Sequence, residues 1–179
     1  MSSKEKRILI IYSSTDGHTI KISKYISKIL TATVDHVSIK DPIPSLKKYD
    51  GIIIGASIRY GFHRAKVKKY INKHYKELNG IPNAFFSVSL IARNKERRNV
   101  DNNPYAKKFL DKIKWKPKNI ALFGGMLNYP AYSFFDRLMI QLIMTITKGP
   151  TDSKTVIEYT DWNQVKNFAT EFNSQIAFD

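Results

Sequence analysis

A run of hydroxyl side chains follows the first apolar segment of the chain and carries its strongest chemical signal. Residues 7–12 are mostly apolar, and a small polar loop begins directly after Tyr12. Backbone N–H groups at the start of a helix, helped by hydroxyls, bind a phosphate dianion well. Gly17 permits the close backbone approach and unusual φ that such a turn needs. The spacing therefore predicts a phosphate-binding turn made of Ser13, Ser14, Thr15, Asp16, Gly17, His18 and Thr19.

Asp16 is the unusual member of this loop, because a carboxylate facing a phosphate would repel it. We expect Asp16 to point away and to cap the following helix. The loop has neither the Gly-x-Gly-x-x-Gly nor the Gly-Lys-Ser/Thr signature of the common nucleotide loops. Ser14-x-Asp16-Gly17-x-Thr19 resembles the Ser/Thr-x-Thr-Gly-x-Thr loop of flavodoxins, which binds the phosphate of FMN. A hydroxyl-capped turn without a ligand is the alternative that the loop alone leaves open.

Short apolar runs alternate with helical patterns along the whole chain. The strands are expected at residues 7–12, 34–38, 51–56, 84–88 and 120–123, and the helices at 19–30, 63–78, 104–114 and 162–178. This alternation predicts an α/β fold, a parallel sheet with helices on both faces. Five strands suggest the flavodoxin-like order 2-1-3-4-5. We see no repeat or linker, so residues 1–179 form a single domain, with Asp161 expected to cap its last helix.

Two further loops follow strands three and four, and they share the carboxyl edge of the sheet with the first loop. In doubly wound sheets this edge binds ligands. A flat aromatic cofactor would lie between the two loops with its phosphate in the first, and Tyr60 could stack on it or remain an ordinary exposed tyrosine. The expected contacts are Ser57, Ile58, Arg59, Tyr60, Ser87, Val88, Ser89 and Leu90.

The composition limits which partners are plausible. Thirty basic residues against 15 acidic ones give a net charge of +15, which favours nucleic acid, an anionic membrane surface or an acidic small molecule. No nucleic-acid motif is recognisable, so nucleic acid is not expected. Arg59 and Arg93 could meet an acidic substrate, although single arginines are more often solvated or paired. The absence of cysteine excludes thiol catalysis, and the four histidines lack metal-ligand spacing, so no metal is expected.

An apolar helical segment after the fifth strand does not fit a minimal doubly wound domain. Residues 134–146 place a broad apolar face on one side of a helix, with Ile140 and Met144 on the other side. Such a face must meet the core, a second subunit in a homo-oligomer, or lipid. The segment is too short and too charged to span a bilayer, and an interfacial helix fits its length and basic surroundings. We place this insert at about residues 127–150.

Several motifs together resemble the menaquinone-dependent protoporphyrinogen oxidases, a flavodoxin-like family, over nearly the whole chain. The second loop, Gly55-Ala56-Ser57-Ile58-Arg59-Tyr60-Gly61, is similar to that of the family. The other matches are Ser14-x-x-Gly17-x-Thr19, Phe86-Ser87-Val88-x-Leu90-x-Ala92-Arg93, Tyr105-Ala106-x-Lys108-Phe109-Leu110, Tyr129-Pro130-x-Tyr132, Asp136-Arg137-x-Met139-Ile140 and Tyr159-Thr160-Asp161-Trp162. The helical insert is the feature that separates this family from plain flavodoxins.

The resemblance implies an FMN enzyme of haem synthesis. Its members oxidise protoporphyrinogen IX to protoporphyrin IX and pass electrons to a membrane quinone, menaquinone or ubiquinone. It also implies a peripheral protein on the cytoplasmic face of the inner membrane. Propionate groups of the substrate would be attracted to the basic surface, and Arg59 and Arg93 are the candidate contacts. No protein acid or base can be assigned from the sequence. A flavodoxin-type electron carrier and an NAD(P)H:quinone reductase are the alternatives.

Overall fold

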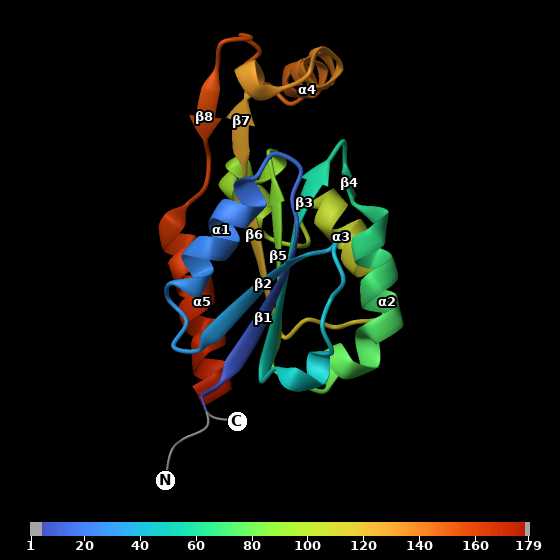
Figure 1. Cartoon of the computed structure of the whole chain (residues 1–179). Helices are drawn as coiled ribbons and strands as arrows, with labels where there is room; N and C mark the ends of the chain where they lie inside the picture. The colour runs from blue at the N-terminus through green and yellow to red at the C-terminus, as the bar shows by residue number, and fades with distance from the viewer. Residues whose placement is uncertain (1–4, 178–179) are drawn as a thin grey trace.

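A computed structural model describes residues 5–177 of the chain. Its order of elements is that of a doubly wound domain with a late excursion (Figure 1). The strands are β1 (Arg7–Ser13), β2 (Thr33–Ser38), β3 (Gly51–Arg59), β4 (Phe62–His63), β5 (Asn83–Ser89), β6 (Asn119–Gly124), β7 (Met126–Asn128) and β8 (Val156–Glu158). The helices are α1 (His18–Ser27), α2 (Ala65–Asn79), α3 (Pro104–Leu110), α4 (Phe134–Ile146) and α5 (Trp162–Ala177), with short 3-10 turns between some elements.

The central sheet has the predicted parallel order. Its strands run β2-β1-β3-β5-β6, which is the order 2-1-3-4-5 once β4 is set aside. The short β4 pairs antiparallel with the end of β3, where Ile58 lies opposite His63. The predicted third strand therefore extends beyond residue 56 to Arg59. This extension places the second loop above the sheet edge.

The alternation of side chains along β1 explains why helices cover both faces of the sheet. Ile8 and Ile10 face α1 and α5, whereas Leu9 and Ile11 face α2 and α3. All four side chains are fully buried, as expected for a parallel strand covered on both sides. The carboxyl edge of the sheet is the part that the helices leave open for a ligand.

Three helices end or begin differently from their sequence-based bounds. Helix α2 begins at Ala65 rather than at residue 63, because His63 belongs to β4. Helix α1 ends at Ser27 rather than at residue 30, and α3 ends at Leu110 rather than at 114. The chain leaves α3 early because Trp115 turns inward and is fully buried against the sheet. Asp161 caps α5 as predicted, since its carboxylate accepts hydrogen bonds from the backbone N–H groups of residues 163 and 164. Phe178, the predicted end of α5, lies outside the described residues.

The excursion after β6 is a two-stranded ribbon that carries a helix. Strands β7 and β8 pair antiparallel, and α4 lies across their far end, well away from the central sheet (Figure 1). Ile140 and Met144 of α4 are buried against Leu127 of β7 and against Tyr129 and Tyr132 of the turn that follows it. The insert was predicted as purely helical, and the ribbon was missed because its strands are only three residues long.

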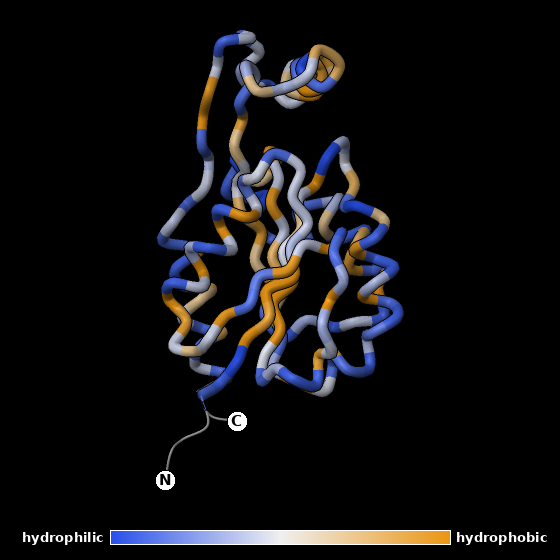
Figure 2. The backbone as a smooth tube through the Cα atoms, in the orientation of Figure 1, coloured by the Kyte–Doolittle hydropathy of each residue, from blue (hydrophilic) through white to orange (hydrophobic). Residues whose placement is uncertain are grey.

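The opposite face of α4 is open to solvent. Figure 2 shows apolar residues in α4 at the end of the molecule remote from the buried strands. Phe134 and Phe135 are 72% and 78% exposed, and the other large exposed side chains of α4 are Leu138, Met139, Leu142 and Ile146. A core position for this face, one of the three sequence-based options, is therefore wrong. Among the described residues, no helix combines the length and apolarity that crossing a bilayer requires.

Candidate functional site

A cavity of about 390 Å³ lies at the carboxyl edge of β1, β3 and β5, beneath α4. All three predicted loops contribute to it, and its size is that of a small-molecule site. Of the predicted residues, the lining contains Ser14, Thr15, Asp16, His18, Thr19, Ser57, Ile58, Arg59, Tyr60, Val88, Ser89 and Leu90. Ser13, Gly17 and Ser87 adjoin these residues in the chain but do not line the cavity.

The first loop has the geometry of an anion site. Gly17 adopts φ +82° and precedes the first residue of α1, so the loop turns sharply into the helix. The side-chain oxygens of Ser13, Ser14 and Thr19 are buried and find no hydrogen-bond partner within the described residues. Buried hydroxyls are normally satisfied, so such a cluster beside a helix N-terminus fits an anionic ligand.

Asp16 does not cap α1, and that expectation is wrong. The N-cap residue is Gly17, which has no side chain to contribute. The Asp16 carboxylate instead accepts a hydrogen bond from Arg59 Nη1 at 2.5 Å. A pair with a guanidinium is favoured over a bond to a neutral backbone N–H. This ion pair directs the Asp16 carboxylate toward Arg59 of the second loop. That Asp16 points away from a bound phosphate stays a prediction.

His18 is held in one orientation by a short relay of hydrogen bonds. Its Nε2 lies 2.6 Å from Thr160 Oγ1, and the Thr160 hydroxyl donates its proton to the Gly124 carbonyl at 2.7 Å. Nε2 must therefore carry the proton that is donated to Thr160. Burial lowers the pKa of His18, with nearby Lys21 adding to the effect and Glu158 opposing it. His18 is thus a neutral ring at the edge of the phosphate loop at pH 7.

The second loop is a tight hairpin between β3 and β4. Tyr60 and Gly61 both have positive φ, 51° and 82°, as a two-residue hairpin turn with right-handed twist requires. This turn aims the ring of Tyr60 at the cavity, where 40% of the residue is exposed. Its hydroxyl donates a hydrogen bond to Asp136 of α4. Stacking of Tyr60 on a flat cofactor stays a prediction.

The third loop contributes Val88, Ser89, Leu90 and Ile91 to the cavity, whereas the Ser87 hydroxyl has a partner elsewhere. Ser87 Oγ lies 2.8 Å from His63 Nε2, on the face of the sheet that α3 covers. His63 also lies 4.2 Å from the ring centroid of Phe109. A contact between Ser87 and a cofactor stays a prediction, and the observed role of its hydroxyl is to hold β4 against β5.

The burial of His63 predicts a loss of stability in mild acid. Burial lowers the pKa of His63 from 6.5 to about 3, so the stability it contributes is complete above 6.5 and falls as the pH drops below that value. The free energy of unfolding should decrease by about 2 kcal/mol between pH 7 and pH 5 from this group alone. Urea unfolding of the parent and of His63→Gln measures this. An equal decrease in both proteins would contradict the assignment to His63.

Arg93 lies outside the cavity and fastens the far end of α4. Its Nη2 donates to the Thr147 carbonyl at 2.7 Å and to Thr147 Oγ1 at 3.0 Å, while Nη1 donates to the Leu90 carbonyl at 3.1 Å. Arg59, by contrast, lines the cavity. A substrate role stays a prediction for both arginines, and the geometry favours Arg59.

The sequence did not identify the part of the cavity that the insert builds. Besides the predicted loops, it is lined by residues of the ribbon, α3 and α4: Tyr105, Gly125, Met126, Asn128, Ala131, Tyr132, Met139, Ile140 and Ile143. The sequence feature that could have indicated this part of the cavity is the motif Tyr129-Pro130-x-Tyr132, which directly precedes the apolar helix. Its meaning depends on the ribbon that folds α4 back over the sheet edge, and that ribbon was not predicted. Within residues 5–177, no cluster of three or more candidate metal ligands occurs.

Comparison with known protein families identifies one match over most of the chain. Residues 9–154 match the model of the flavodoxin domain. A protoporphyrinogen IX dehydrogenase [quinone] of Leishmania major is 43% identical over 177 residues, which cover 96% of this chain and 77% of that protein. The protein of the same name from Escherichia coli K12 is 41% identical over 169 residues, which cover 92% of this chain and 93% of that protein.

Solved structures with the same fold are more distant in sequence. Flavodoxin 1 of Bacillus cereus superposes with a TM-score of 0.54 at 16% identity, covering 94% of this chain and 98% of that one. A Fusobacterium nucleatum flavodoxin bound to flavin mononucleotide gives a TM-score of 0.51 at 12% identity, covering 97% and 98%. These likenesses support the flavodoxin-like fold, whose strand order the sheet shows directly.

Proposed function

The chain belongs to the flavodoxin domain family and, within it, to the protoporphyrinogen IX dehydrogenases (quinone), and we propose its function on that basis. It is an FMN-dependent oxidoreductase that converts protoporphyrinogen IX to protoporphyrin IX and passes the electrons to a quinone. The observation that supports this function best is that the loops at the sheet edge and the insert together form one cavity. Unpartnered hydroxyls of the phosphate loop lie at one end of it, and α4 covers it.

The first loop fits the phosphate of FMN. Ser13, Ser14 and Thr19 offer three hydroxyls that need a partner, and the N-terminus of α1 adds a favourable dipole. The loops after β3 and β5 would hold the flavin ring between Tyr60 and the backbone around Ser89. When bound, FMN supplies the redox chemistry, and the protein supplies position and electrostatics.

The arginines should affect substrate capture rather than cofactor content. Arg59→Gln is expected to raise KM for protoporphyrinogen and to flatten its dependence on salt, because a cation facing the cavity is lost. Arg93→Gln tests the same role at a position outside the cavity. Steady-state kinetics at several salt concentrations, with FMN content measured by absorbance, check this prediction. Unchanged KM and salt response with intact activity would mean that these arginines have another role.

We further propose that the protein binds an anionic membrane surface through α4. Helix α4 and strand β4 lie toward the same end of the molecule (Figure 1). Phe62 of β4 is 65% exposed, and Lys108 Nζ lies 5.6 Å from its ring centroid. Basic residues beside an apolar face are typical of interfacial helices. The net charge of +15 would favour anionic lipid, and a lipid-soluble quinone would enter from that side.

On this proposal the protein is peripheral and lies on the cytoplasmic face of the inner membrane. The proposed electron acceptor is a membrane quinone, menaquinone or ubiquinone, as in the family. A second subunit covering α4 in a homo-oligomer is the competing occupant of the same face. Vesicle binding and the mass of the protein in solution distinguish the two.

Steady-state turnover tests the proposed function against its two alternatives. The FMN-loaded protein should turn over protoporphyrinogen with a quinone, and NADPH with a quinone should give only background. The opposite result would identify an NAD(P)H:quinone reductase. Activity with neither pair, despite full FMN content, would favour an electron carrier.

A further inference from the structure

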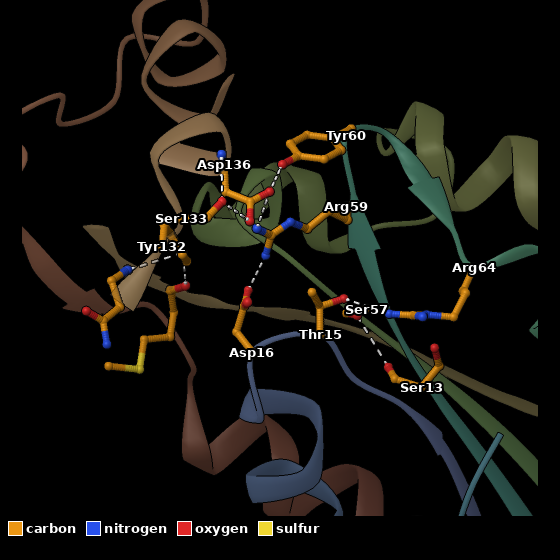
Figure 3. A network of polar contacts seen from close by, with 12 residues as sticks. Ser13, Thr15, Asp16, Ser57, Arg59, Tyr60, Arg64, Tyr132, Ser133 and Asp136 are labelled. Atoms are coloured by element: carbon orange, nitrogen blue, oxygen red, sulfur yellow. Dashed lines mark hydrogen bonds and ion pairs between the residues drawn. The ribbon is translucent and has the colours of Figure 1, made fainter. Parts of the chain in front are cut away.

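A carboxylate of α4 is held by donors from the β3–β4 hairpin and from the N-cap residue of α4 itself. Asp136 accepts hydrogen bonds from Arg59 Nη2 at 2.9 Å, from Ser133 Oγ at 2.8 Å and from the hydroxyl of Tyr60 (Figure 3). The other terminal nitrogen of Arg59 is paired with Asp16. The side chain of Arg59 therefore bridges the phosphate loop and the insert.

The surroundings of Arg59 are those of a carboxylate receptor. Its guanidinium carbon lies 5.4 Å from the ring centroid of Tyr60 and 5.4 Å from that of Tyr132. A planar cation between two aromatic rings is held in one orientation, and a neighbouring phenol adds a directional donor. All three residues line the cavity, whereas Asp136 does not. The receptor thus borders the ligand space and is also in contact with Asp136.

We propose that Arg59 and Tyr60 form the subsite for a carboxylate group of the substrate, and that Asp136 occupies this subsite when no substrate is bound. The inference rests on the proposed function, because the porphyrinogen supplies the competing carboxylates. On binding, a substrate propionate takes the place of the Asp136 carboxylate on Arg59 and Tyr60. The N-terminal turn of α4 is then released, while Arg93 still holds Thr147 at the other end of the helix.

Exchange of one carboxylate for another suits the charges of this site. Arg59 already has two acidic partners, so a third carboxylate would be repelled by both negative charges unless one of them leaves. Both acids contact water, with 46% of the Asp16 side chain and 35% of the Asp136 side chain exposed. Asp136 is the one that must leave, because it holds Tyr60 as well as Arg59, the two donors of the proposed subsite. Ion pairs that remain in contact with water contribute little to stability, so a competing anion can replace them.

Protonation is not an alternative way to open this contact near neutral pH. Hydrogen bonds from Tyr60, Arg59 and Ser133 lower the pKa of Asp136 to about 2. The carboxylate therefore stays charged throughout the physiological range and is displaced by competition. A neutral ligand of the same shape would not displace Asp136, because it carries no negative charge to compete for Arg59.

The test compares a porphyrin that carries free carboxylates with its ester. Protoporphyrin IX and its dimethyl ester are titrated into the FMN-loaded parent, Asp136→Asn, Arg59→Gln and the control Asp152→Asn, and binding is followed by porphyrin fluorescence. Asp152 is also an acid of the excursion, and its side chain accepts a hydrogen bond from the backbone N–H of Lys154. Asp136→Asn should bind the free acid about tenfold more tightly, because an internal competitor is lost, with little change for the ester.

Arg59→Gln should lose the preference for the acid over the ester, and the control should match the parent. Hydrogen exchange adds a second measurement. Amides at residues 134–139 should exchange faster in Asp136→Asn than in the parent, and faster in the parent with the free acid bound than with the ester.

Two failures are distinguishable. If the parent binds both porphyrins and Asp136→Asn leaves the ratio of acid to ester affinity unchanged or lowers it, the inference is wrong while the proposed function stands. If neither porphyrin binds an FMN-loaded parent, the proposed function is wrong, and the inference falls with it.

Discussion

Thr19→Ala should weaken FMN binding by about tenfold or more while leaving the free protein at least as stable as the parent. A hydroxyl that donates to a phosphate contributes about 1.5–3 kcal/mol. In the free protein Thr19 Oγ1 is buried without a partner in the described residues, so its removal forfeits no internal hydrogen bond. Isothermal titration with FMN and thermal unfolding of the free protein measure the two effects separately.

Gly17→Val should be more damaging to FMN binding than Thr19→Ala. A Cβ at Gly17 would meet no protein atom within 4 Å, so the cost comes from the φ of +82° and from obstructing the ligand. Gly80→Val is the matched control, since Gly80 has φ −87° and lies beyond the C-terminus of α2. Thr170→Ala, on the exposed side of α5, controls for the loss of a hydroxyl. Unchanged FMN affinity in both loop variants would refute the phosphate-loop assignment.

Leu138→Glu combined with Leu142→Glu should release the protein from anionic vesicles and leave the flavin fold intact. Both side chains are more than half exposed, at 56% and 54%, so the charges enter water rather than a core. Turnover with a membrane quinone should fall much more than FMN affinity, because the acceptor enters from lipid. Sedimentation with vesicles of anionic lipid, at low and raised salt, gives the direct measurement.

A charge-matched control separates membrane contact from general repulsion. Asn167→Glu with Thr170→Glu adds the same two charges to the exposed side of α5. This variant should still sediment with vesicles nearly as well as the parent. If the α4 variant forms monomers where the parent is a dimer, and the parent ignores anionic vesicles, then a second subunit covers α4 and the membrane proposal is wrong.

The central sheet and most of its cofactor edge could be predicted from the sequence because their signals are local. The isoleucine-rich runs of β1 and β3 are typical of strands buried on both faces, and the loop after β1 carries its hydroxyls next to one another. The hydrogen bonds by which Asp161 caps the start of α5 also follow from a local capping pattern. In these places the pattern in the sequence and the tertiary structure favour the same conformation.

The insert could not be predicted in the same way, because its structure depends on distant pairs. Asp16 was expected to cap α1, and the partner that prevents this is Arg59, 43 residues further along the chain. Arg59 in turn holds Asp136 of α4, a contact that no spacing rule predicts. The ribbon of β7 and β8 joins segments separated by the whole of α4. The part of the cavity formed by α4 therefore depends on contacts between distant residues, whereas the part formed by the sheet-edge loops follows from local sequence patterns.

The most direct test of the account follows the two halves of the reaction on the FMN-loaded protein without oxygen. Protoporphyrinogen IX should bleach the absorbance of the oxidised flavin, and a quinone added afterwards should restore it, with porphyrin formed in proportion. NADPH should leave the spectrum unchanged. Bleaching by NADPH together with no response to protoporphyrinogen would contradict the account.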